Sequence, residues 1–482
     1  MKLFRNSMRR GASSILPAVS LLLAIFAGCA GTVPENLPEG EPAVVERSDA
    51  EMPLRPLTST SAKAPPELKD DGLTLKECID IATTRNPGLS AVRWDLKAAG
   101  HEVDIAQSAA LPDLRATADY TDYINDQPLI AIGGNPQAST FTDDIASAGL
   151  MVDLPIYTGG RITNRIEAAK LLRKASSHTL ARTRKELVFN VTSVFYSILA
   201  QRHVIESVQF SRKALKEHLD QVKNLIANQR ATKADRLRTE VRLADVKEEL
   251  ARQRNVLDVK LHTLEKLLGV DEASGNISLA GELEFREKSL QGAAAAVSTA
   301  YDSRRDLAAT RSKVKAQTRN VDVARAEYWP KIAFQAAYGP RWDVSHMSSA
   351  EDAGRVGVGL SLPLFEGGRI QANVLKQKSE LKAAKQRMRQ LKHQVRLEVR
   401  TAMENVSSAR ERAEASQKAI QQGKESLRIE RLKYRNGKAS ITDVLDAQDD
   451  LLRSQRNYYR ALADHKTAVA ELRLAVGKDG QK

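Results

Sequence analysis

The chain has few cysteines and few aromatic residues. Its 482 residues include two cysteines, and aromatic side chains make up 5% of the composition. Two cysteines cannot build a disulfide framework, and so few aromatic residues are unusual for compact globular domains. Charged residues reach 28%, with a formal net charge of +14, and this composition favours long, charged helices.

Motifs typical of catalysis or of cofactor binding are also missing. The eight histidines never fall four residues apart or at ligand spacing with cysteine, so we expect no zinc or copper site. The methionines are scattered, and no Gly-x-Ser-x-Gly elbow occurs. No Gly-Lys-Ser/Thr follows the glycine pairs, which excludes a phosphate loop. A Ser/His/Asp triad stays open, but the sequence predicts no enzyme and no cofactor.

The N-terminus looks like a secretory signal peptide over residues 1–28. Lys2, Arg5, Arg9 and Arg10 precede an apolar run at 15–27, which is too short to span a bilayer comfortably. An exported chain rarely meets nucleic acid, so the basic charge predicts no nucleic-acid partner.

The leader ends in Phe26-Ala27-Gly28-Cys29, which resembles a bacterial lipobox with Cys29 as the lipidated N-terminus. Phe26 departs from the usual leucine, and the alternative is a plain signal peptide with a chance cysteine. Ala30 stands where lipoproteins kept at the inner membrane usually carry Asp. The resemblance therefore implies a lipid anchor in the outer membrane of a Gram-negative bacterium.

Residues 29–72 are rich in Pro, Glu, Ser and Thr and cannot bury a core. We expect a disordered tether between the acylated end and a folded body that starts near Leu73. Cys78 lies just beyond it, and we interpret it as an inert thiol packed on a helix.

The second half of the chain repeats the first. Leu154-Pro155-Ile156-Tyr157-Thr158-Gly159-Gly160-Arg161 returns as Leu362-Pro363-Leu364-Phe365-Glu366-Gly367-Gly368-Arg369, and the same shift carries Asp235 onto Asp443. Upstream, a slightly larger shift carries Pro112 onto Pro330. Such self-similarity predicts two copies of one structural unit, at 73–281 and 282–477, followed by a tail at 478–482.

Each copy contains a predicted β-hairpin, bounded by Pro112 and Pro155 or by Pro330 and Pro363. Apolar residues alternate with polar or small ones, with the period of a strand that has one greasy and one wet face. The first hairpin is longer, and we expect its extra residues near Pro128 to Pro136 to lengthen an external loop. The apolar positions are Leu114, Ala116, Ala118, Tyr120, Leu150, Val152, Leu154, Ile332, Phe334, Ala336, Tyr338, Val356, Val358, Leu360 and Leu362.

These strands are about long enough to cross a bilayer when tilted. Four strands cannot close a barrel, and open edges in lipid cost several kcal/mol per unpaired group, so the chain must oligomerise if the strands lie in a membrane. Tyr157, Phe365, Tyr328 and Trp329 gather at one end, where an interfacial aromatic girdle would sit. An ordinary soluble hairpin packed on helices is the alternative.

Helical periodicity fills the rest of each copy. We expect helices at 74–110, broken at Pro87, and at 291–328, then about seventy helical residues after each Gly-Gly-Arg, roughly 100 Å long. Gly437 suits a helix C-terminus, and Ser440 with Asp443 forms a capping box like that of Thr232 with Asp235. Antiparallel helices then return to 269 and 477. The coiled-coil seam of the second long helix is Leu381, Ala384, Met388, Leu391, Val395, Val399, Ala402, Val406, Ala409 and Ala413.

Together, the Leu-Pro-Leu-Phe-Glu-Gly-Gly-Arg segment at 362–369 and the Tyr-Arg-Asn-Gly-Lys-Ala-Ser-Ile-Thr-Asp-Val-Leu-Asp-Ala-Gln segment at 434–448 resemble the TolC-type outer-membrane efflux protein family. The likeness covers about residues 73–477. It implies a mainly α fold with four transmembrane strands per chain, and a homotrimer that closes one 12-strand barrel, continued by an α-helical tunnel. The lipobox resembles the lipoprotein branch, which implies a periplasmic adaptor and an inner-membrane pump of the resistance-nodulation-division type.

The resemblance also implies roles for residues at the hairpin tips. Family members ring their periplasmic mouth with two aspartates, which map onto Asp443 and Asp446, and Tyr434 matches a tyrosine that helps hold the mouth shut in some relatives. For Asp443, a capping role alone is the alternative. Ala439 stands where those relatives have an arginine that, with the tyrosine, holds the mouth shut. The expected adaptor contacts are Gly437, Lys438, Ala439, Ser440, Ala231 and Thr232, and the expected strand-to-helix turns are Pro155, Gly159, Gly160, Pro363, Gly367 and Gly368.

The sequence therefore predicts a passive outer-membrane conduit of a tripartite efflux system. Two alternatives stay open: the export channel of a type I protein secretion system, and a periplasmic coiled-coil scaffold or adaptor without a pore. A scaffold has no reason to keep two hairpins of bilayer length.

Overall fold

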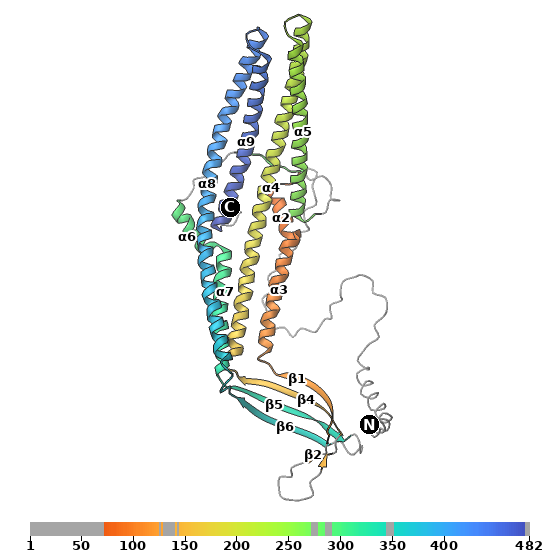
Figure 1. Cartoon of the computed structure of the whole chain (residues 1–482), viewed down its shortest axis with the longest axis vertical. Helices are drawn as coiled ribbons and strands as arrows, with labels where there is room; N and C mark the ends of the chain where they lie inside the picture. Colours follow the sequence, from red (N-terminus) through yellow and green to blue (C-terminus); the bar gives the residue numbers. More distant parts are fainter. Residues whose placement is uncertain are drawn as a thin grey trace, which may run out of the picture. The chain divides into compact units, whose positions relative to one another are not determined.

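The described elements follow one order twice, with a pair of short helices, a β-hairpin, a long helix and an antiparallel return helix (Figure 1). The computed structural model describes residues 72–124, 127–128, 140–141, 144–270, 278–284, 292–343 and 351–477. The helices of the first copy are α2 (Leu75–Arg85), α3 (Pro87–Ser108), α4 (Arg161–Ala227) and α5 (Lys233–Leu268). Those of the second are α6 (Ala293–Ser303), α7 (Arg305–Arg325), the 3₁₀ turn η2 (Ala326–Tyr328), α8 (Arg369–Arg435) and α9 (Ile441–Val476).

Several expectations lie outside these residues. They are the signal peptide, Cys29, the tether up to residue 71, most of the extra residues of the first hairpin, and the tail at 478–482. Among the described residues, no helix combines the length and the apolar character needed to cross a bilayer.

The strands form one antiparallel sheet in the order β1-β4-β5-β6. Its members are β1 (Asp113–Asp122), β4 (Asp144–Tyr157), β5 (Lys331–Asp343) and β6 (Glu351–Ser361), and a small pair joins β2 (Gln127–Pro128) to β3 (Thr140–Phe141). The two hairpins share one sheet because β4 pairs with β5.

The expected boundary at Pro155 is wrong. Pro155 lies inside β4, which continues to Tyr157, and a bulge between Pro155 and Tyr157 shifts the register against β5. Proline cannot donate a ladder hydrogen bond, so a bulge is a place where a strand tolerates it. Pro363 does lie beyond the end of β6, within the turn that leads to α8.

The break expected at Pro87 is confirmed, and the second copy contains a break that we did not expect. Asn86 caps α3, its side-chain oxygen accepting a 3.0 Å hydrogen bond from the Leu89 amide, and Pro87 takes the first helical position. In the second copy α6 and α7 are separated at Arg304, where no proline occurs.

Both long helices contain 67 residues, close to the predicted length. In α8 the seam residues Val395, Val399 and Ala402 are fully buried, and they pack with Ala300 and Leu307 of the short helices. The first four predicted seam residues, Leu381 to Leu391, are only half-buried. The seam is thus confirmed where other helices of the same chain cover it.

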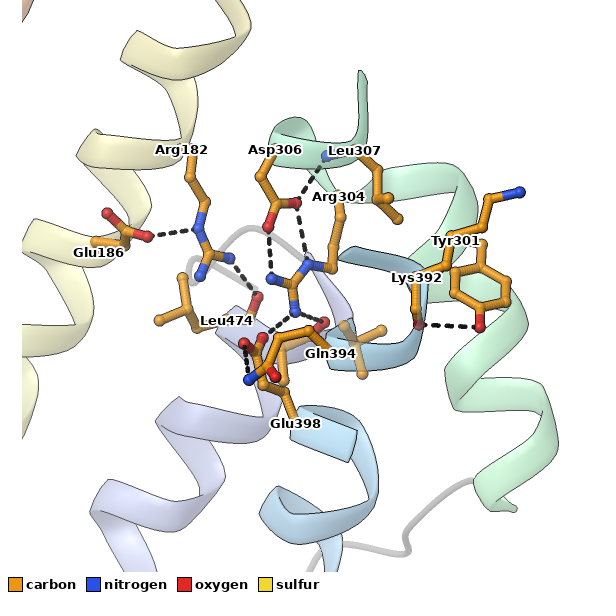
Figure 2. A network of polar contacts seen from close by, with 12 residues as sticks. Arg182, Glu186, Tyr301, Arg304, Asp306, Leu307, Lys392, Gln394, Glu398 and Leu474 are labelled. Atoms are coloured by element: carbon orange, nitrogen blue, oxygen red, sulfur yellow. Dashed lines mark hydrogen bonds and ion pairs between the residues drawn. The ribbon is translucent and has the colours of Figure 1, made fainter. Parts of the chain in front are cut away.

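A buried arginine fastens the end of α9 (Figure 2). The Arg304 side chain is 1% exposed, pairs with Asp306 at 2.6 Å and Glu398 at 2.5 Å, and donates to the Ala475 carbonyl at 3.3 Å. Arg182 of α4 donates to the Leu474 carbonyl at 3.3 Å. Arg304 thus satisfies a carbonyl of the last helical turn, and Arg182 adds a second donor to the Leu474 carbonyl, which also accepts from the Gly477 amide at 3.2 Å. The two arginines join both repeats at one point.

Candidate functional site

The four-stranded sheet has one apolar and one polar face. Directly paired residues share a face, and the pairs Leu114↔Val152, Leu150↔Tyr338 and Phe334↔Val358 are apolar on both sides. The opposite face carries the pairs Asp113↔Asp153, Asp119↔Ser147, Asp153↔Gln335 and Ala337↔Arg355. The predicted alternation is therefore confirmed and is in register across all four strands.

Hydrogen bonds organise the polar face. The Gln335 amide donates to the Asp153 carboxylate at 2.9 Å, and the Ser147 hydroxyl donates to Asp119 at 2.8 Å. Polar groups on this face therefore find partners across neighbouring strands, whereas the apolar face presents exposed side chains such as Val356 and Leu360. Water suits the first face and hydrocarbon the second.

Both outer strands have a free edge. In the sheet order β1-β4-β5-β6, each end strand pairs on one side only within the described part of the chain, and nearly all described residues of β1 and β6 are exposed. A free edge exposes a row of unpaired N–H and C=O groups, which hydrocarbon cannot satisfy. A sheet with an apolar face and two such edges is incomplete in one chain.

The strand-to-helix turns depend on glycine pairs. Gly159, Gly160, Gly367 and Gly368 have φ values of 61°, 81°, 57° and 83°, a left-handed region that other residues adopt at a cost. Each second glycine occupies the N-cap of a long helix. The two glycine pairs lie between a strand and a long helix, and the four aromatic residues expected nearby, Tyr157, Tyr328, Trp329 and Phe365, are all exposed.

At the other end of the long helices, two capping boxes hold the tips. Asp443 accepts from the Ser440 amide at 2.8 Å while its own amide donates to the Ser440 hydroxyl at 3.3 Å, and Thr232 with Asp235 repeats the arrangement. The hydrogen bond from Ser440 lowers the pKa of Asp443. The capping role considered for Asp443 is thus present, and its side chain remains exposed.

The other expected tip residues differ in their surroundings. Asp446 is exposed and makes no hydrogen bond or ion pair within the described part of the chain, as expected for a residue that no cap needs. Gly437 has a φ of 70°, and its first-copy counterpart Gln229 adopts 58° without being glycine. Lys438 and Thr232 are exposed, while Ala439 and Ala231 are half-buried.

Tyr434 faces the interior of the helical packing. Its ring lies 5.6 Å from that of His218 on α4, and its hydroxyl is buried without a hydrogen-bond partner among the described residues. Burial, with a smaller contribution from Asp235, raises the pKa of Tyr434. Tyr434 therefore joins α8 to α4 within one chain.

Sequence reasoning missed the polar contacts between the two helical hairpins, α4/α5 and α8/α9. Arg242 of α5 pairs with Asp449 of α9, Arg456 pairs with Glu249 at 2.8 Å, and Gln448 donates to Ser211 at 3.3 Å. Partners about two hundred residues apart give no local signal. The one sequence signal that could have been used concerns the helix break at Arg304. The shift that relates Pro112 to Pro330 places Arg304 on Asn86, where the helix of the first copy also breaks.

Comparison with known proteins identifies the family. The sequence matches the family described as "Outer membrane efflux protein" over residues 78–270 and 296–478. The chain belongs to this family. The two matched segments fall on the two copies of the repeat, and the family consists of channel proteins rather than enzymes.

Individual relatives are distant but match over most of their length. The chain is 24% identical to the outer membrane protein TolC of Vibrio cholerae, a match that covers 84% of this chain and 90% of that one. It is 24% identical to the outer membrane protein OprJ of Pseudomonas aeruginosa, with 84% of each covered. The solved outer-membrane channel OprN has the same fold, with a TM-score of 0.73 at 19% identity over 84% of this chain and 90% of that one.

Proposed function

We propose that this efflux protein is a passive conduit built from three copies, which passes substrates from an inner-membrane pump to the exterior. The observation that carries this proposal is the sheet with two faces and two free edges. Three copies of a four-stranded sheet give twelve strands, enough to close a barrel with a polar interior and an apolar exterior. Closure gives every edge group a partner, as lipid requires.

The helices would continue the conduit away from the membrane. The antiparallel pairs α4/α5 and α8/α9 begin at the strand-to-helix turns and pack against one another through α4 and α9 (Figure 1). We propose that their tips ring the periplasmic mouth, with Asp443 and Asp446 of three copies placing six carboxylates around it. Such a ring favours cations.

The same tips are the proposed docking points of a periplasmic adaptor, through Gly437, Lys438, Ala439, Ser440, Ala231 and Thr232. The adaptor would link the conduit to a pump of the resistance-nodulation-division type, which supplies the energy. We further propose that Cys29 carries the lipid anchor in the outer membrane. Crosslinking from cysteines placed at Lys438 and Thr232, followed by mass spectrometry, would identify the adaptor and pump, and an adaptor of a type I secretion system would assign the conduit to that alternative.

Two neighbouring arginine substitutions test the faces of the sheet. Ala118 lies on the apolar face in the middle of β1, and the adjacent Thr117 lies on the polar face. An arginine on the lipid face costs about 2–4 kcal/mol near the bilayer midplane, so Ala118→Arg should sharply reduce assembled protein in membranes. Thr117→Arg should assemble normally and lower single-channel conductance in planar bilayers.

Either of two results would contradict the proposal. One is that the wild-type chain conducts while the Ala118→Arg and Thr117→Arg variants assemble equally well in membranes. The other is a purified wild-type chain that stays monomeric without detergent and never conducts, which would favour the scaffold without a pore.

A further inference from the structure

The first half of α8 carries positive charge along one side. Seven cations recur there at steps of three or four residues, which places them on one side of the helix over roughly 33 Å. Six of them are exposed, and Lys392 is half-buried. We call this set the basic stripe, and its members are Lys378, Lys382, Lys385, Arg389, Lys392, Arg396 and Arg400.

No carboxylate of the helix balances the basic stripe. Between Arg369 and Met403 the helix contains two acidic residues, Glu380 and Glu398, and helical spacing places both on the side opposite the stripe. Glu398 is also held by Arg304 at 2.5 Å. Within the described residues, no member of the basic stripe makes an ion pair. Like charges at these spacings repel one another and weaken the helix that carries them.

The second half of the same helix is arranged differently. Arg410 pairs with Glu414 at 2.9 Å, and Arg428 pairs with Glu425 at 2.7 Å. Both pairs join neighbouring turns on the surface of α8, where each cation has its own counterion. The unbalanced charge is therefore a local property of the first half of α8.

The first copy of the repeat lacks the basic stripe. The repeat shift that carries Arg161 onto Arg369 places Ser177, Ala181 and Val188 of α4 at the positions of three of the seven cations. Helix formation and solubility therefore do not demand cations at these positions of the fold. A role outside the chain explains why only one copy carries them.

The packing of α6 indicates which way the basic stripe faces. The Tyr301 hydroxyl of α6 donates to the Lys392 carbonyl at 3.2 Å, and Met403, which continues the same side of α8, packs on the cluster that contains Ala296 and Ala300 of α6. The stripe and α6 thus share one side of α8. An extra helix from each copy fits on the outer surface of the proposed conduit and would obstruct its interior. The stripe therefore faces outward.

The basic stripe begins beyond the reach of lipid headgroups. At 1.5 Å per residue, Lys378 lies about 15 Å and Arg400 about 48 Å along α8 from the turn at Gly368. The headgroup layer on one side of a bilayer is only about 5–8 Å thick. If the strands span the membrane, the stripe therefore lies in the periplasm, and its counterion is a polyanion of that compartment.

We propose that the basic stripe binds peptidoglycan through the free carboxylates of its peptide stems. The inference rests on the proposed function, because it requires the sheet to lie in the outer membrane and α8 to extend into the periplasm. Single exposed contacts between a cation and a carboxylate are weak, but several on one rigid helix act together on one polymer. Three copies would present three such stripes around the conduit.

Two double substitutions test the side of the helix. Lys385→Gln with Arg389→Gln removes two charges of the basic stripe. Lys376→Gln with Arg387→Gln is the matched control, because it removes one lysine and one arginine from the opposite side of α8. All four residues are exposed and make no ion pair within the described part of the chain. Glutamine keeps a high helix propensity, so both variants should fold, and helical circular dichroism would check this.

The assay sediments the full-length protein, in a non-ionic detergent, with purified peptidoglycan sacculi. We expect at least about fivefold less of the stripe variant than of the wild type in the pellet, and as much of the control variant as of the wild type. Wild-type binding should fall as salt rises from about 0.1 M to 1 M, because the screening length shrinks from about 10 Å to 3 Å. Sacculi whose carboxylates have been amidated should no longer sediment the wild-type protein.

Three results would overturn the proposal. They are equal sedimentation of the stripe variant and the wild type, no sedimentation of the wild type, and a stripe variant that keeps its binding to sacculi but loses binding to vesicles of phosphatidylethanolamine and phosphatidylglycerol. The last result would assign the stripe to lipid.

Ion conductance in planar bilayers tests the conduit separately. A stripe variant that conducts like the wild type but no longer sediments with sacculi supports both proposals. A wild-type chain that sediments with sacculi but never conducts would overturn the conduit and leave the binding of peptidoglycan in place.

Discussion

Replacing Arg304 with methionine should destabilise the protein more than any exposed arginine substitution. The Arg304 side chain is 1% exposed and holds two carboxylates, Asp306 and Glu398, together with the Ala475 carbonyl. Arg304→Met keeps most of the apolar volume and removes every one of these bonds. Removing one partner of a buried ion pair costs about 3–5 kcal/mol, and because Asp306 and Glu398 are 23% and 35% exposed, water keeps the cost here near the lower end of this range.

Arg412→Met is the matched control. Arg412 also bridges two helices of the second repeat, to Asp464 at 2.8 Å, but the two side chains are 55% and 50% exposed. Such a pair contributes about 0–1 kcal/mol. Urea unfolding of the detergent-solubilised protein, followed by helical circular dichroism at pH 7.5, would compare the two variants. If Arg304→Met unfolds at the same urea concentration as Arg412→Met, the fastening role of Arg304 is wrong.

Three further predictions follow from the structure. Asp446→Ala should lower the preference for cations in single-channel recordings without changing stability. Asp443→Ala should lower the cation preference and also the stability, because it removes a capping box worth about 1 kcal/mol. Unchanged selectivity in both variants would count against the carboxylate ring. His218 is buried beside Tyr434, Gln221 and Arg431, and burial, together with the charge of Arg431, lowers the pKa of His218. The unfolded chain therefore binds a proton at His218 more readily than the folded chain does. Stability should fall as the pH drops below about 6.5. His218→Leu should flatten that part of the pH dependence in urea unfolding at pH 7.5 and 5.5, and an unchanged slope would exclude His218 as its source. Gln229→Gly should raise the thermal midpoint because it relieves a left-handed φ of 58°, and the gain in stability should reach up to about 1 kcal/mol. Gly437→Gln should lower the thermal midpoint. Shifts of the midpoint in the opposite directions would show that neither φ is strained.

The sequence alone predicted most of the architecture because the determining signals are local or repeated. Alternation after Pro112 and Pro330 predicted the faces of the sheet, and the capping boxes at Thr232 and Ser440 predicted where the return helices begin. The error at Pro155 has a local cause as well. Proline usually ends a central strand, but a bulge lets β4 continue past it.

The contacts between distant segments could not be predicted in this way. Nothing near Arg242 indicates Asp449 as its partner, and nothing near Arg304 indicates its distant partner Glu398. A charged residue on an amphipathic helix is normally solvated, and only the crossing of several helices changes its surroundings. For Tyr434 the family resemblance supplied the position, and the structure supplied the packing partner, His218.

Matched helix lengths have a consequence for how this chain can tolerate insertions. The helices α4 and α8 each contain 67 residues, and α5 and α9 each contain 36. Adding one heptad to α4 and α5 alone would displace that tip by about 10 Å relative to the other and leave a staggered rim. Length changes in one repeat should therefore survive only when the other repeat acquires the same change.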